Sequence, residues 1–101
     1  MKYQLIIQFP ETVLSYDDLI ELEDLIIAAL NENLADVDGH DMGAGEANIF
    51  ILTNEPVKVF EEVKKLLSMQ LVREVKAAYR EIAGEEYFII WPDSLKYFRV
   101  V

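Results

Sequence analysis

The amino-acid sequence predicts a single α+β domain in which an antiparallel sheet carries two helices on one face. Short apolar runs rich in β-branched residues alternate with two longer segments that have helical periodicity. The segments follow one another as strand, helix, strand pair, helix and strand pair, and a sheet covered by helices on one side accommodates that order. With 101 residues the chain has room for one domain, residues 1–101, and one modest core.

The chain begins with a strand and a helix. Lys2–Phe9 is rich in Ile, Leu, Tyr and Phe and is stopped by Pro10, which is typical of a strand. Ser15 with Asp18 three residues later forms a capping box, and the helix that it starts runs to about Leu30. The predicted buried stripe consists of Leu19, Leu22, Ile26 and Leu30, widened by Ile20, Leu25, Ile27 and Ala29.

An acidic, glycine-spaced stretch then leads into an apolar strand. Three of the four glycines lie here, and glycine supplies backbone angles that other residues reach only with strain, so a tightly shaped loop is expected. Leu34–Asp38 is predicted as a short strand and Ala47–Thr53 as a buried one. The loop turns the first back into the second, which makes Asp36–Glu46 the exposed tip of a hairpin.

A second helix follows the buried strand. Thr53 or Asn54 is expected to cap it, and Pro56 suits its first turn. Its predicted core stripe consists of Val59, Phe60, Val63, Leu66 and Leu67.

The last third of the chain contains one ambiguous segment. Val72–Ile82 fits both an alternating strand and a helical period, and the strand is preferred because a turn at Gly84 leads into the strand-like Tyr87–Trp91. Tyr97–Val101 is expected to pair on an edge or to pack as a tail. The whole order predicts a ferredoxin-like βαββαβ sandwich with an extra C-terminal strand.

The formal net charge of −10 lies entirely in the first half of the chain. Residues 1–50 hold eleven acidic side chains against Lys2 alone, whereas residues 51–101 hold eight acids and eight bases. Such a surface repels a phosphate backbone, which disfavours nucleic-acid binding, and it attracts a basic protein. An acidic surface that only keeps the protein soluble is the competing interpretation.

The acidic residues around the only histidine are the candidates for a hard-cation site or for general-base chemistry. Oxygen ligands suit such a cation, but the spacing departs from the EF-hand pattern, and no nucleophile is evident beside His40. A neighbouring carboxylate, Asp38 or Asp41, could orient His40 as a general base, but a hydrogen-bonded loop histidine that fixes the turn is preferred. The metal candidates are Asp36, Asp38, His40, Asp41 and Glu46.

The segment Asp38-Gly39-His40-Asp41-x-Gly43-x-Gly45-Glu46-x-Asn48-Ile49-Phe50-Ile51-x-Thr53 resembles a set of small bacterial proteins. The resemblance also includes Ala77-Ala78-Tyr79-Arg80 and Ile89-Ile90-Trp91-Pro92. It implies no activity and no site; it indicates only that the loop and the strand after it belong together.

These observations favour a non-enzymatic, cytoplasmic protein-interaction domain without a cofactor. The chain has no cysteine, no signal-peptide pattern at its start, and no apolar run of the roughly 20 residues that a membrane span requires. One alternative is an immunity- or antitoxin-like inhibitor of a basic toxin. Another is a small ligand-binding protein or enzyme that uses His40, which would require a well-formed pocket. The residues expected to meet a basic partner are Glu21, Glu23, Asp24, Asp38 and Asp41.

A homodimer through the sheet is also expected. Leu5–Ile7, Ile49–Leu52 and Phe88–Trp91 are apolar at consecutive positions, and neighbouring residues of a strand point to opposite faces. Apolar side chains must therefore lie on the face that the helices leave bare, where a second copy would cover them. The rival is a monomer in which Tyr97–Val101 folds over that face.

Overall fold

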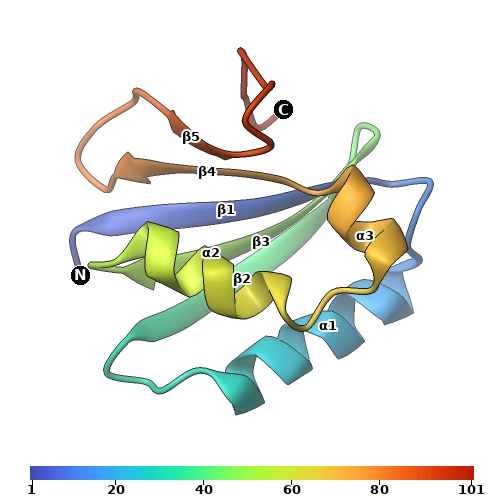
Figure 1. The fold of residues 1–101 in the computed structure, drawn as a ribbon, viewed down its shortest axis with the longest axis horizontal. Coiled ribbons are helices and arrows are strands. Elements are labelled where there is room, and N and C mark those ends of the chain that lie inside the picture. Colours follow the sequence, from blue (N-terminus) through green and yellow to red (C-terminus); the bar gives the residue numbers. More distant parts are fainter.

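The computed structural model describes all 101 residues and has an α+β architecture, an open antiparallel sheet of five strands with three helices. The helices lie together on one side of the sheet (Figure 1). The strands are arranged in the order β2-β3-β1-β4-β5. The elements are β1 (Tyr3–Pro10), α1 (Tyr16–Ala29), β2 (Ala35–Gly43), β3 (Glu46–Thr53), α2 (Pro56–Lys64), α3 (Met69–Glu74), β4 (Lys76–Glu81) and β5 (Phe88–Trp91).

The first strand of the chain is the central strand of the sheet. β1 pairs antiparallel with β3 on one side and with β4 on the other. Its alternation divides the interior in two, because Leu5, Ile7 and Phe9 join the core under the helices while Ile6 joins a smaller cluster on the opposite face. All four side chains are buried, as the apolar pattern of this strand predicts.

Helix α1 begins as predicted and buries a narrower stripe than predicted. The Ser15 hydroxyl accepts a hydrogen bond from the Asp18 amide, and the Asp18 carboxylate accepts one from the Ser15 amide, which confirms the capping box. Leu19, Leu22 and Ile26 are buried. The expected widening is wrong at three positions that lie on the solvent side of the helix, Leu25, Ile27 and Ala29.

The glycine-spaced stretch is a strand and not a loop. β2 runs from Ala35 to Gly43, so the predicted tip contracts to a two-residue turn, Ala44 and Gly45. Both turn residues have positive φ, 54° and 86°, as tight hairpin turns of the type I′ class require. Gly39 also has positive φ, 136°, and sits where the β2–β3 register shifts. The glycine therefore serves a bulge inside a strand, which sequence spacing does not distinguish from a loop.

The segment predicted as one strand from 72 to 82 is divided between two elements. Helix α3 ends at Glu74 and β4 begins at Lys76, so both periodicities seen in the sequence are real but apply to successive parts. Val75, at the junction, is buried in the helix-side core. For α2, Pro56 stands at the first helical position as expected, but neither Thr53 nor Asn54 is the N-cap; Glu55 takes that place without a side-chain bond.

The C-terminal segment packs as a tail over the sheet face that bears no helices. Phe98 is 7% exposed and forms a buried cluster with Ile6 and Ala78. Partly buried apolar side chains close around these three: Phe50, Tyr87, Ile89, Leu95 and Val100. The apolar face that led us to expect a dimer is therefore covered by the chain itself.

Candidate functional site

Three side chains from α1 and β2 form a hydrogen-bonded chain at one margin of the molecule. His40 Nδ1 lies 3.0 and 3.1 Å from the two carboxylate oxygens of Glu23. On the other side of the ring, Nε2 lies 3.3 Å from the Tyr16 hydroxyl, and the two rings meet edge to face with centroids 5.7 Å apart. Tyr16 and Glu23 are seven residues apart, two helical turns, so they share the face of α1 that looks toward β2.

This geometry assigns the donor at each contact. A carboxylate only accepts, so Nδ1 of a neutral His40 carries the proton and donates to Glu23. Nε2 is then the acceptor, and the Tyr16 hydroxyl donates to it. The side chains of Glu23 and His40 are 13% and 24% exposed, so this bridge ties α1 to β2 in a partly dehydrated position.

The strand geometry explains why His40 does not pair with its neighbours in sequence. Asp41 is adjacent on β2 and points to the opposite face, and the bulge between Val37 and Gly39 removes Asp38 from the regular alternation. Neither Asp38 nor Asp41, the carboxylates considered for a general base, binds His40; its carboxylate partner is Glu23. The five candidate ligands around the glycines do not converge either, because no three His, Asp or Glu side chains come together as a metal site.

A carboxylate, an imidazole and a hydroxyl in series are the components of a general-base relay, and such a relay also needs a place for substrate. None of the five principal cavities is lined by any of the three residues. The hydrogen bonds of Tyr16, Glu23 and His40 instead join α1 to the edge strand β2, and we call this cluster the clamp.

We expect His40→Ala to keep the fold and to lower the free energy of unfolding by about 1–3 kcal/mol, because it leaves the largely buried Glu23 carboxylate without its partner. Tyr16→Phe removes only the exposed hydroxyl contact and should change stability by less than about 0.5 kcal/mol. Urea unfolding followed by circular dichroism measures both. Equal stability of His40→Ala and wild type would show that the clamp contributes nothing.

The acidic residues predicted to meet a partner divide into two groups. Glu21 and Asp24 are exposed on the outer side of α1, and Asp38 and Asp41 are exposed on β2. Glu23 does not belong with them, because its carboxylate is occupied by His40.

Ion pairing differs sharply between the two halves of the chain. Lys64 pairs with Glu61, Lys65 with Glu62, and Lys2 with Glu81, with nitrogen–oxygen distances of 3.2–3.9 Å. None of the eleven acids in residues 1–50 pairs with a lysine or an arginine; Glu23 is bound by His40 instead. The negative charge of α1 and β2 is therefore not neutralised within the molecule.

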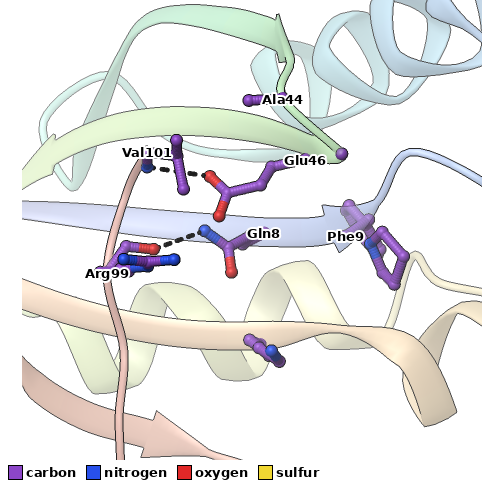
Figure 2. A pocket seen from close by; sticks show the side chains of 9 residues that line it. Gln8, Phe9, Ala44, Glu46, Arg99 and Val101 are labelled. Carbon is purple, nitrogen blue, oxygen red and sulfur yellow. Dashed lines mark hydrogen bonds between the residues drawn. The ribbon is translucent and has the colours of Figure 1, made fainter.

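The opposite face carries a polar cleft of about 290 Å³ where the tail meets the hairpin turn. Gln8 Nε2 donates to the Arg99 carbonyl over 3.0 Å, and the Val101 amide donates to a Glu46 carboxylate oxygen over 3.2 Å (Figure 2). Asn48, beneath them, accepts from Gln8 and donates to Asp41 and Glu46. The polar groups of this cleft hold the tail down.

The hydrogen bonds that hold the C-terminal tail on the sheet were not predicted from the sequence. Gln8 and Asn48 are polar residues inside otherwise apolar strands, and both are buried. Buried polar side chains require partners, so their position in the strands was a usable signal that something polar must cover that face.

The fold and its surfaces thus define a small α+β domain with an uncompensated acidic side. No protein-family model, curated protein or solved structure matches this chain. None of its helices is both long and apolar enough to cross a membrane.

Proposed function

We propose that this protein is a small, non-enzymatic, cytoplasmic interaction domain that binds a basic protein through the acidic surface of α1. The observation that carries the proposal is the absence of any lysine or arginine partner for the acids of the first half. Complementary charge steers association and penalises wrong partners, so an uncompensated acidic surface favours a basic protein over other macromolecules. An immunity- or antitoxin-like inhibitor that covers a basic toxin is a narrower form of the same proposal, and a neighbouring gene for such a toxin would favour it.

The surface proposed for the partner is the outer side of α1, represented by Glu21 and Asp24. Both are exposed and neither side chain makes a hydrogen bond or an ion pair within the molecule, so we expect their replacement to preserve the fold. Glu23 is unsuitable for this purpose, since its substitution would break the clamp to His40.

We expect the double charge reversal Glu21→Lys with Asp24→Lys to lower the affinity of the complex at least about tenfold, because two attractive charges become repulsive toward a basic partner. Affinity capture with the wild-type protein, mass spectrometry of what is retained, and titration of the purified partner measure it. The wild-type complex should also weaken as salt is raised through the range where the Debye length falls from about 10 Å to about 3 Å.

The matched control is Glu85→Lys with Glu86→Lys. These two residues are exposed, form no ion pair, and change the net charge by the same amount on a surface outside α1. A partner that is acidic, or one that binds both double variants and wild type equally at all salt concentrations, contradicts the proposal.

We also propose that the fold is a ferredoxin-like βαββαβ sandwich with β5 added at one edge. Support comes from the order β4-β1-β3-β2 of the first four strands and from the helices on one face only. We propose that the protein self-associates through the sheet only when the C-terminal tail, including Phe98, detaches from the sheet and exposes Ile6 and Ala78.

A further inference from the structure

A groove with an apolar floor lies between α1 and the segment that connects α2 to α3. Its volume is about 360 Å³. In Figure 1 that connection passes beside α1. The apolar side chains that line it are Val13, Leu14, Leu22, Leu25, Leu66 and Leu71.

The apolar character of this groove reaches the surface. Leu25 is 50% exposed at its margin, although it belongs to a helix whose other leucines are buried. Met69 does not line the groove, but it lies in the chain between two polar residues that do, Ser68 and Gln70, and it is 75% exposed. Methionine is flexible and adapts to different partner shapes, which makes it common on binding surfaces. Large apolar side chains left in contact with water favour burial by a partner.

The polar rim of the groove has one sign of charge. Asp18 and Glu21 line it from α1, while Ser68 and Gln70 face them from the other wall without charge. No lysine or arginine lines the groove. Asp18 is partly occupied by the capping box, so Glu21 is the rim carboxylate that makes no hydrogen bond or ion pair within the molecule.

We propose that this groove receives a basic amphipathic segment of the partner protein, which inserts a large aliphatic or aromatic side chain and sets lysine or arginine against Asp18 and Glu21. This inference rests on the proposed function, because the acidic face of α1 forms one wall of the groove. In protein–peptide complexes, an apolar side chain commonly fills a pocket and charged residues at the rim of the pocket contribute to specificity.

Charge and topology select this occupant over the alternatives. A second copy of this chain also has a net charge of −10 and would bring its own acids to the rim. Nucleic acid is repelled for the same reason. The tail of the chain is seated on the other face of the sheet, against Ile6 and Ala78.

The test uses two synthetic peptides of about 14 residues, a length at which a helix can form on binding. One has leucines at helical spacing and lysines elsewhere; the other has the same lysines with each leucine replaced by glutamine. Fluorescence anisotropy should give an affinity at least about tenfold higher for the leucine peptide. Amide shift changes in NMR spectra should cluster at residues 13–25 and 66–71.

Two variants on the same helix locate the site. Leu25→Ser should weaken binding of the leucine peptide about five- to tenfold, whereas Ile27→Ser should leave it unchanged within about twofold. Ile27 is a close match, since it is 54% exposed on α1 and does not line this groove. Both residues are exposed enough for serine to be tolerated without unfolding.

The outcomes separate this inference from the proposed function. If both peptides bind alike and Leu25→Ser has no effect, while Glu21→Lys with Asp24→Lys abolishes binding, the acidic surface stands and the groove is excluded. If neither the reversal nor Leu25→Ser matters, both proposals fail. Binding of an uncharged detergent as strongly as of the leucine peptide would show a general apolar site and overturn the choice of a basic partner.

Discussion

Replacing Phe98 by alanine is expected to lower the free energy of unfolding by about 3 kcal/mol, at the lower end of the range for a buried phenylalanine because its cluster is small. Phe98 is 7% exposed and packs on Ile6 and Ala78, and its ring meets Tyr87 with centroids 5.2 Å apart. Domains of this size have roughly 5–15 kcal/mol of stability, so the loss is a large fraction of the total. Urea unfolding measures it.

Tyr97→Ala is the matched control, because this neighbouring aromatic residue is 69% exposed and should contribute less than about 0.5 kcal/mol. A second readout is sedimentation equilibrium at micromolar concentration. Wild type should sediment as a single species near 11.7 kDa, while Phe98→Ala should associate, because its sheet face is uncovered. Equal losses for the two variants would mean that the tail does not cover the sheet in solution.

Asn48→Asp is expected to destabilise the protein by about 3–5 kcal/mol, the range for an uncompensated buried charge. Asn48 is 1% exposed, and its amide nitrogen donates to Asp41 over 2.9 Å and to Glu46 over 3.4 Å. Aspartate has nearly the same shape, but it replaces the amide group of Asn48 by a carboxylate. That carboxylate cannot donate to Asp41 or Glu46 and is repelled by both. The stability deficit should shrink as the pH is lowered, because protonation of the introduced carboxyl group removes its charge.

Asn33→Asp controls for the change of net charge, since Asn33 is exposed and its side chain makes no hydrogen bond. It should stay within about 0.5 kcal/mol of wild type in the same urea experiment. A deficit for Asn48→Asp that is no larger than this, or that grows as the pH falls, would contradict the network described for Asn48.

Structural features that depend only on residues close together in the sequence were predictable. The capping box at Ser15 and Asp18 needs only a spacing of three residues, and the apolar run of β1 needs only its composition. β2 was misread, because glycine marks any backbone with positive φ and the sequence does not say whether that backbone is a turn or a bulge. The helix at Met69 was missed because both periods fit its last residues.

The candidate site was less predictable, because its contacts join distant parts of the chain. Net charge and its uneven distribution are additive properties, so the acidic half was evident from the sequence. The pairing of His40 with Glu23 depends on how α1 lies against β2, and the bond from Gln8 to the Arg99 carbonyl joins the two ends of the chain. Neither follows from spacing along the sequence.

The central position of β1 has a consequence for how the protein folds. Tyr3 pairs with Thr53 on one side and with Glu81 on the other, so β1, which precedes both of its partner strands in the chain, completes its pairing only after β4 has been synthesised. Contacts so distant in sequence slow folding, because a long loop must close before any of them forms. Until then the apolar side chains Leu5, Ile6 and Ile7 lack their partner strands, which exposes β1 to misassociation during synthesis.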